Sequence, residues 1–140
     1  MKVALIADSL TSDALSLEAN LYSLTPLNYR FVLKFFKVDF LFVESAWQGH
    51  KNKWKFKIAS YKDYPQRNNK RLQNVVTYAK KLGIPTVFWN KEDGVHFDRF
   101  IDSAKLFDHI FTVDENCIPR YKKALNDKVT VNTLMFAVQH

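Results

Sequence analysis

Two patterns of hydrophobic and polar residues alternate along the chain: short apolar runs and apolar residues at helical spacing. Short apolar runs, several of them β-branched, predict buried strands at 2–7, 38–43, 86–89, 109–113 and 129–131. Between these runs, apolar residues recur at helical spacing and predict helices from 9–13 to about Leu21, from Thr25-Pro26 onward, from Asn68 or Asn69 to Gly83, around 97–104, and around 118–125. Strand and helix therefore alternate along the whole chain.

Two of the predicted helices have clear starts and apolar stripes. Thr25 can cap a helix that has Pro26 in its first position, and the stripe that follows is Leu24, Leu27, Phe31 and Phe35. The helix that ends before Gly83 carries its stripe at Leu72, Val75, Val76, Ala79 and Leu82. We expect both stripes to be buried, because an amphipathic helix packs its apolar face on the core.

The alternation predicts βαβ units, which form a mostly parallel sheet with helices on both faces. No repeat or low-complexity linker divides the 140 residues, and this length suits one compact domain. The expected fold class is therefore α/β, a Rossmann-like three-layer α/β/α sandwich with a mostly parallel sheet of about five strands. We expect residues 1–140 to form this domain as one unit.

The longest irregular segment runs from Glu44 to Asn69, and a loop of this length is often functional. Lysines at 51, 53, 55 and 57 alternate with Asn52, Trp54, Phe56 and Ile58, which predicts an extended piece with one basic face. Residues 50–81 hold 10 Lys and Arg against one acid, whereas the rest of the chain holds 11 against 13. We favour a solvated surface for this basic region over a nucleic-acid site. Contact with the phosphates of a sugar nucleotide or a lipid-linked acceptor is an intermediate possibility.

Several function classes find no support in the sequence. The glycines Gly49, Gly83 and Gly94 are too far apart to form a dinucleotide-binding or phosphate-binding loop. One cysteine rules out an internal disulfide and a cysteine-rich zinc site. No apolar run approaches the roughly 20 residues of a membrane-spanning helix, and the first residues lack a signal-peptide pattern. We expect a cytoplasmic protein.

In an open parallel sheet, ligands bind beyond the carboxyl ends of the strands, so the residues that follow each predicted strand are site candidates. They include six of the 14 acids in a chain that is basic overall. Like charges brought together at one edge favour a polar site there. The candidate substrate-binding residues are Asp8, Glu44, Ser45, Trp47, Gln48, Asn90, Lys91, Glu92, Asp114 and Glu115.

Structural roles explain part of this cluster. Asp93 and Asp114 stand where helix caps belong, and Asp8 is a third candidate cap. Glu44, Trp47 and Asn90 have no such role. A tryptophan beside a carboxylate suits a sugar, because the ring stacks on the sugar and the carboxylate accepts from its hydroxyl groups. Trp89, in contrast, is expected in the core.

Two residues near this edge have other possible chemistry. Histidine can act as a general base near neutral pH, so His96 is a catalytic candidate, with a structural role as the alternative. Its spacing from Glu92 and Asp93 matches no standard metal site. Cys117 lies in the first turn of a predicted helix, whose dipole could lower the thiol pKa. We expect it to be a small buried residue instead.

Four segments at these strand ends resemble a known family: 43–49, 84–93, 96–100 and 114–121. They are similar to the amino-terminal domain of CgeB-like bacterial glycosyltransferases, a family named after a spore-maturation protein and also found in surface-polysaccharide loci. The resemblance covers nearly the whole chain, but it gives little information about the substrate. Gly94 and Met135 depart from it, because each stands where proline is expected.

The resemblance implies the GT-B architecture, in which two Rossmann-like domains face a cleft. Residues 1–140 would then be the N-terminal, acceptor-side domain, inactive without a carboxy-terminal domain that holds most nucleotide-sugar contacts. The implied reaction moves a sugar from a nucleotide-sugar donor to a cell-surface glycan or a related acceptor. In an inverting mechanism, Asp93 or His96 would be the catalytic base. The resemblance also implies that no bound metal or cofactor is needed. An isolated domain of this kind could also form a homodimer through its exposed domain-facing surface.

Two further function classes remain open. The same edge could recruit a carbohydrate or a protein as a standalone binding module. The region 50–81 could bind single-stranded nucleic acid, since aromatic residues lie among its cations. A receiver-like phosphoacceptor domain is not indicated, because neither an acidic pair after the first strand nor a lysine after the fifth is evident.

Overall fold

The computed structural model of the chain describes residues 1–47, 49, 52–125 and 128–135. Its single sheet has six strands in the order β2-β1-β3-β4-β5-β6, and every neighbouring pair is parallel. The strands are β1 (Lys2–Ile6), β2 (Asn20–Ser23), β3 (Phe40–Glu44), β4 (Thr86–Asn90), β5 (His109–Thr112) and β6 (Thr130–Thr133). The α/β prediction is confirmed, with six strands where about five were expected.

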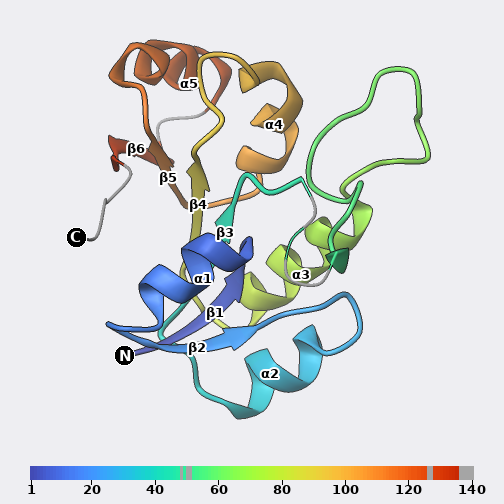
Figure 1. The fold of residues 1–140 in the computed structure, drawn as a ribbon, viewed down its shortest axis with the longest axis vertical. Helices are drawn as coiled ribbons and strands as arrows, with labels where there is room; N and C mark the ends of the chain where they lie inside the picture. The colour runs from blue at the N-terminus through green and yellow to red at the C-terminus, as the bar shows by residue number, and fades with distance from the viewer. Residues whose placement is uncertain (48, 50–51, 126–127, 136–140) are drawn as a thin grey trace.

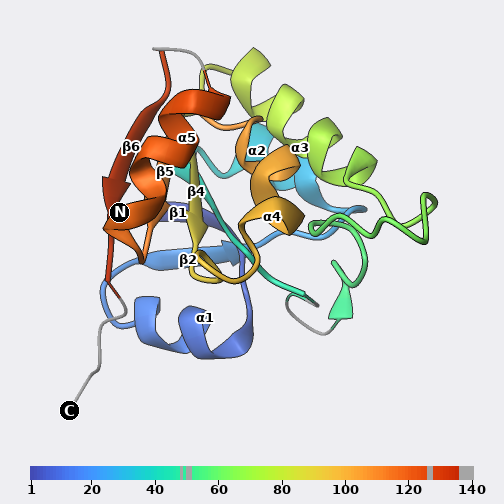
Figure 2. The ribbon, with the colours of Figure 1, turned by 90° about the horizontal axis from the view of Figure 1, so that it is seen from above.

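The helices cover the two faces of this sheet unequally. They are α1 (Ser9–Leu15), α2 (Tyr29–Phe35), α3 (Lys70–Lys81), α4 (Phe97–Ala104) and α5 (Ile118–Ala124). Figure 2 shows α1 on one side of the sheet and the other four helices on the opposite side. The larger core lies between these four helices and the sheet, and Leu15 of α1 packs on a smaller core around Leu5 and Phe42.

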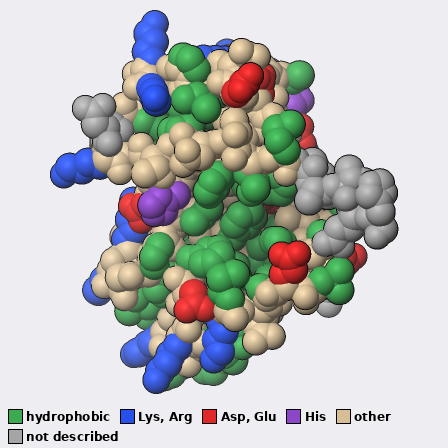
Figure 3. Space-filling view, turned by 90° about the vertical axis from the view of Figure 1, so that its left-hand side faces the viewer, with side chains coloured by type: hydrophobic (Ala, Val, Ile, Leu, Met, Phe, Trp, Pro, Cys, Tyr) green, Lys and Arg blue, Asp and Glu red, His purple; other side chains and the backbone are tan. Residues whose placement is uncertain are grey.

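The face that carries α1 leaves part of the sheet accessible. Phe40, Phe42, Val87 and Phe111, from β3, β4 and β5, line an apolar groove of about 300 Å³. In Figure 3, which views the left-hand side of Figure 1, hydrophobic side chains gather at the centre. Among the described helices, none is both long enough and apolar enough to cross a bilayer.

Strand β2 lies where the sequence predicted the end of a helix. Helix α1 begins at Ser9 as expected but ends at Leu15, six residues before Leu21. Residues 20–23 pair instead with β1, in a register that sets Lys2 opposite Asn20 and Leu5 opposite Ser23. The predicted helix end is therefore wrong, because hydrogen bonding to β1 overrides the weak local preference of this stretch.

Helix α2 differs from its prediction in both its start and its buried face. It begins at Tyr29, while Thr25 Oγ1 accepts from the backbone N–H groups of Leu27 and Asn28 (3.2 and 3.0 Å) and so stabilises the turn before it. Tyr29, Val32 and Leu33 face the core. The predicted stripe is wrong beyond the buried Leu24, because Leu27, Phe31 and Phe35 are 91%, 61% and 62% exposed.

Helix α3 follows its prediction closely. Asn68 Oδ1 accepts from the N–H of Lys70 (3.1 Å) at the helix start, and Gly83 follows the helix with a φ of +75°. The stripe Leu72, Val75, Val76 and Ala79 is buried, and only its last member, Leu82, is exposed.

The segment 52–59 consists of turns, so the predicted extended basic piece is wrong there; Lys51 lies outside the described residues. Asn52 and Phe56 have φ values of +60° and +61°, which break a two-residue alternation. Trp54 is fully buried, and its indole N–H donates to the carbonyl of Leu24 (2.8 Å). Burial of this ring in the main core fixes the segment in its turns.

Candidate functional site

The carboxyl ends of the parallel strands bring the candidate residues to one edge of the sheet. Asp8 follows β1, Glu44 ends β3, Asn90 ends β4, and Asp114 comes shortly after β5. The edge divides into two parts by burial and partners. We call Asp8, Glu44, Ser45 and Lys91 the closed half, and Trp47, Asn90, Asp93, His96 and Tyr121 the open half. Gln48 lies outside the described residues.

Glu44 is the centre of the closed half and is fully buried. One carboxylate oxygen accepts from the backbone N–H of Asp8 (2.6 Å) and from the ammonium of Lys91 (3.1 Å). The other oxygen accepts from the hydroxyl of Thr11 (2.5 Å). Both oxygens therefore have partners within the chain, as a buried charge requires.

Lys91 and Ser45 complete the closed half. The Lys91 ammonium also lies 3.7 Å from a carboxylate oxygen of Asp8, whose other oxygen accepts from the N–H of Gly49 (3.0 Å). Ser45 Oγ accepts from the N–H groups of Lys91 and Glu92 (2.9 and 3.3 Å), which anchors the turn after β4. Asp8 occupies the N-cap position of α1, but its side chain makes no cap hydrogen bond.

The closed half stands at the point where the strand order reverses. The chain winds from β1 to β2 in one direction and then continues through β3 to β6 in the other, so the reversal falls between β1 and β3. Ligands of doubly wound sheets usually bind at such a reversal. Here Lys91 neutralises Asp8 and Glu44, the two acids at the ends of β1 and β3. The contacts of the closed half are therefore those of a structural ion-pair group.

A chain of hydrogen bonds defines the open half. The Asn90 amide donates to the Tyr121 hydroxyl (2.9 Å), which in turn donates to Asp93, lying 2.8 Å from each carboxylate oxygen. Asn90 is fully buried, and its amide oxygen accepts from the N–H of Glu92 (3.1 Å). Two buried polar groups thus form a chain of hydrogen bonds that ends at one partly exposed carboxylate.

This environment raises the pKa values of Asp93 and Tyr121. Burial raises the pKa of Asp93, while hydrogen bonds, including the one from Tyr121, oppose the rise. Burial also raises the pKa of Tyr121, and the adjacent negative charge of Asp93 adds to this effect. Asp93 is therefore a stronger base than an ordinary aspartate, and Tyr121 stays a hydrogen-bond donor.

An aromatic group around Trp47 packs on the start of helix α4. The Trp47 ring lies edge-to-face against His96 (5.1 Å between centroids) and Phe100 (4.9 Å). The guanidinium of Arg99 lies 5.5 Å from the Trp47 ring centre. Phe97, the residue after His96, packs on Tyr121 (4.7 Å), so the aromatic group and the Asp93 relay share one support.

The remaining candidates have plainer surroundings. Asp114 caps the 3₁₀ turn at 115–117, because its Oδ1 accepts from the N–H of Asn116 (3.0 Å). Asp93 is not a cap, since His96 holds the N-cap position of α4. Glu115 is exposed and Glu92 is half-buried.

Cys117 is buried, as expected, and burial together with the charge of Asp93 raises the pKa of its thiol. The alternative of a thiol with a lowered pKa is therefore wrong. Trp89 is also buried, as expected, and its indole N–H donates to the carbonyl of Leu134 (3.0 Å).

Sequence reasoning missed three contributors to this edge. Tyr121 lies in the helix predicted around 118–125, and only its hydroxyl distinguishes it from the apolar residues of that helix. No sequence pattern indicated the other two residues. They are Thr11, which has a buried hydroxyl on α1, and Arg99, which lies beside the Trp47 ring. Their roles depend on contacts with residues 28 or more positions away.

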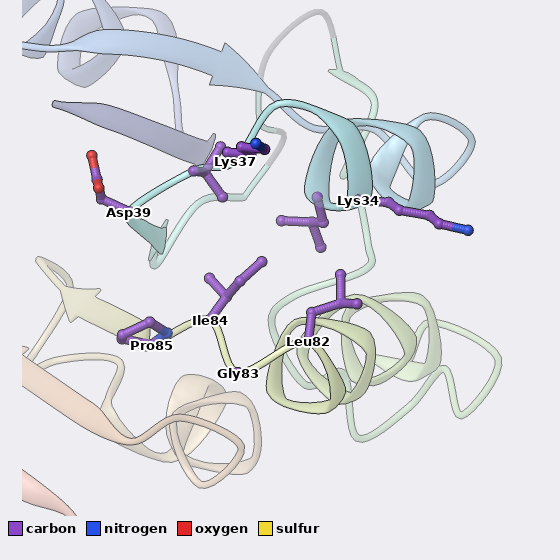
Figure 4. A pocket seen from close by; sticks show the side chains of 9 residues that line it. Lys34, Lys37, Asp39, Leu82, Gly83, Ile84 and Pro85 are labelled. Atoms are coloured by element: carbon purple, nitrogen blue, oxygen red, sulfur yellow. The ribbon is translucent and has the colours of Figure 1, made fainter.

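Four cavities of about 210 to 440 Å³ that described residues line contain no residue of the closed or the open half. One of about 420 Å³ lies at the opposite, amino edge, between the ends of α2 and α3 (Figure 4). Asp39 on its wall accepts from the N–H of Lys2 (2.7 Å), and Figure 4 shows the Lys34 side chain pointing away from the cavity. Among the residues that the structure describes, no group of three or more His, Cys, Asp or Glu is placed to hold a metal ion.

Comparisons of this chain with models of known families, with curated proteins and with solved structures found no match.

Proposed function

We propose that the open half binds carbohydrate and that the chain is the acceptor-side domain of a glycosyltransferase. The transfer would move a sugar from a nucleotide-sugar donor to a cell-surface glycan or a related acceptor. The observation that carries the proposal is the half-buried Trp47 ring, with Arg99 beside it, on the same support as the Asp93 relay. A flat ring that shares a helical support with a carboxylate of raised pKa suits a hydroxyl-rich substrate that must lose a proton.

The roles of the residues follow from their contacts. Trp47 would stack on the sugar ring, and Asp93 would accept the proton of the acceptor hydroxyl. The hydroxyl oxygen then bonds to the anomeric carbon of the donor sugar while the bond from that carbon to the nucleoside diphosphate breaks. Tyr121 and Asn90 hold the Asp93 carboxylate in place, so they are positioning residues. His96 is the second candidate for the base.

Binding is tested first, by nuclear magnetic resonance of the indole N–H groups. Trp54 and Trp89 donate theirs to backbone carbonyls and serve as internal references, while Trp47 reports on the open half. Maltose, cellobiose and chitobiose are the acceptor probes, and UDP-glucose is the donor probe. We expect one of the saccharides to shift the Trp47 signal alone.

Matched variants separate this proposal from nucleic-acid binding. Trp47→Leu keeps an apolar contact with Phe100 but removes the flat ring, so it should abolish the shift. Tyr64→Ala removes an exposed ring that packs on Arg67 (4.1 Å) in the basic region and should leave saccharide binding unchanged. Binding of an oligothymidylate that depends on Tyr64 and not on Trp47, without saccharide binding, would contradict the proposal.

Catalysis is tested in the polypeptide as its source cell makes it. We expect an immunoblot to show a product about two to three times the 16.4 kDa of this chain, as two domains would require. Sugar transfer by that product should fall at least about a hundredfold in Asp93→Asn if Asp93 is the base. Asp98→Asn, an exposed acid that pairs with Arg120 (3.6 Å), is the control. Full transfer by Asp93→Asn would remove Asp93 from the mechanism.

A further inference from the structure

Helix α2 turns an apolar stripe away from the molecule. Leu27, in the turn before the helix, is 91% exposed, and Phe31 and Phe35 are 61% and 62% exposed. Their spacing of four residues places them in one row along the helix. The Phe31 and Phe35 rings pack on each other (5.1 Å). Figure 1 shows α2 at the lower end of the molecule, where no other described element lies outside it.

A row of cations accompanies this stripe. Arg30, Lys34 and Lys37 are exposed, and no acid occurs between Glu18 and Asp39. The Lys34 ammonium lies 5.5 Å from the Phe35 ring centre, so charge and ring are side by side. We call these six residues, Leu27, Arg30, Phe31, Lys34, Phe35 and Lys37, the α2 ridge.

Helix α3 extends the positive charge beside the ridge. Tyr78 of α3 contacts Tyr29 of α2 edge-to-face (6.0 Å), so this side of α3 faces α2. Arg71 and Lys81 are exposed and lie seven residues before and three residues after Tyr78, which places them on the same side. The apolar stripe is therefore bordered by cations from two helices.

We propose that the α2 ridge docks the protein on an anionic membrane surface. Leu27, Phe31 and Phe35 enter the boundary between headgroups and acyl chains, and the flanking cations contact lipid phosphates. Exposed aromatic residues beside Lys and Arg on a surface helix are the pattern of interfacial membrane binding. Each cation near an anionic surface strengthens binding about fivefold, and the effect weakens as salt rises.

A second copy of the chain fits this surface poorly. In a twofold dimer the same patch meets itself, which would bring two sets of Arg30, Lys34 and Lys37 together without an acid from this segment. The ridge is also a convex helix surface, so a protein partner would need a matching groove. A lipid surface needs none. The proposal does not depend on the sugar-binding role of the open half.

A fluorescent reporter tests the docking directly. Cys117 is the one cysteine and is buried, so a cysteine introduced on the surface can be labelled selectively. Phe31→Cys carries an environment-sensitive dye on the ridge, and Val95→Cys carries it at a site that is 84% exposed on another part of the surface. Vesicles contain phosphatidylcholine alone or about three parts of it to one of phosphatidylglycerol.

We expect the dye at position 31, but not at 95, to shift to shorter wavelength on the anionic vesicles only, and high salt to reverse the shift. In unlabelled protein, Phe31→Ser with Phe35→Ser should weaken vesicle co-sedimentation at least about tenfold. Leu17→Ser with Val95→Ser, which removes two exposed apolar side chains elsewhere, should not.

Three results would overturn the proposal. The first is a wild-type chain that does not sediment with anionic vesicles. The second is vesicle binding that the ridge variant leaves unchanged. The third is a dimer in sedimentation that the ridge variant abolishes while vesicles have no effect, which would assign the ridge to a second copy.

Discussion

The two halves of the carboxyl edge contain the same kinds of residue but differ in how their charges are balanced. In the closed half, a lysine lies 3.1 Å from the buried Glu44 and 3.7 Å from Asp8, so the acids are neutralised within the chain. In the open half, Asp93 receives hydrogen bonds from a neutral tyrosine, and burial raises its pKa. The paired charges of the closed half therefore stabilise the fold, whereas the open half keeps a carboxylate that can accept a proton.

This difference explains why acidic residues at strand ends are poor evidence of a site by themselves. Glu44 ends β3 and Asp93 follows the neighbouring β4, and the sequence makes both of them site candidates. Only the partners distinguish them, because an ion pair lowers the reactivity of a carboxylate while a raised pKa increases its basicity. Substitutions that alter one half at a time can test this division.

The largest expected effect is in the closed half. Lys91→Met removes the cation from a fully buried carboxylate and should lower the free energy of unfolding by about 3 kcal/mol. The measurement is urea unfolding at neutral pH. Adding Glu44→Gln should restore much of the loss, since the buried charge is then gone. If Lys91→Met is as stable as the wild type, the closed half is not held by this ion pair.

Next in size is the relay of the open half. Tyr121→Phe leaves the buried Asn90 amide without its acceptor and removes one donor from Asp93, so we expect a loss of about 1.5 kcal/mol. The same unfolding experiment measures it. Phe97→Leu, which alters packing on Tyr121 without touching the hydroxyl, is the comparison. An unchanged Tyr121→Phe variant would mean that water replaces the hydroxyl.

Asp93→Asn should change stability in the opposite direction. Because the folded-state pKa of Asp93 is raised, the folded chain binds the proton more tightly than the unfolded chain, and ionisation above this pKa disfavours folding. The variant should therefore be the more stable protein at neutral pH, and the difference should vanish below about pH 4, where aspartate is protonated in both states. Urea midpoints at the two pH values decide this, with Asp98→Asn as control.

The smallest effect on stability is expected at His96. Its ring contacts Trp47 at the surface, so His96→Ala should change the free energy of unfolding by no more than about 0.5 kcal/mol. Saccharide binding at Trp47 should weaken in the same variant, because the ring loses a lateral support. Thermal unfolding and the indole titration can be run on one sample. A large destabilisation would place His96 with the closed half.

Much of the fold could be predicted from the pattern of apolar and polar residues. Helices α2 and α3 show the limit of such predictions. The apolar residues of α3 form one stripe, so its buried face was predictable. Helix α2 is apolar on two sides, with Tyr29, Val32 and Leu33 on one and Phe31 and Phe35 on the other. Periodicity cannot choose between two stripes, and packing against α3 decided the choice.

The sequence predicted where the candidate site lies but not that it divides into a closed and an open half. Parallel strands bring their carboxyl ends together, which located Glu44, Asn90 and Asp93 at one edge. The hydrogen-bond partners could not be predicted from local sequence, because Lys91 and Glu44 are 47 positions apart and Tyr121 and Asp93 are 28 positions apart. Strand β2 was missed for the same reason, since its pairing with β1 is not a local property.

The strand order also has a consequence for how the chain is made. From β4 onward, each new strand joins the edge formed by the one before it, in the order of synthesis. A chain emerging from the ribosome can therefore complete β2-β1-β3 and then extend this sheet by one βαβ unit at a time. No later strand has to insert between two that are already paired, so translation and folding can advance together.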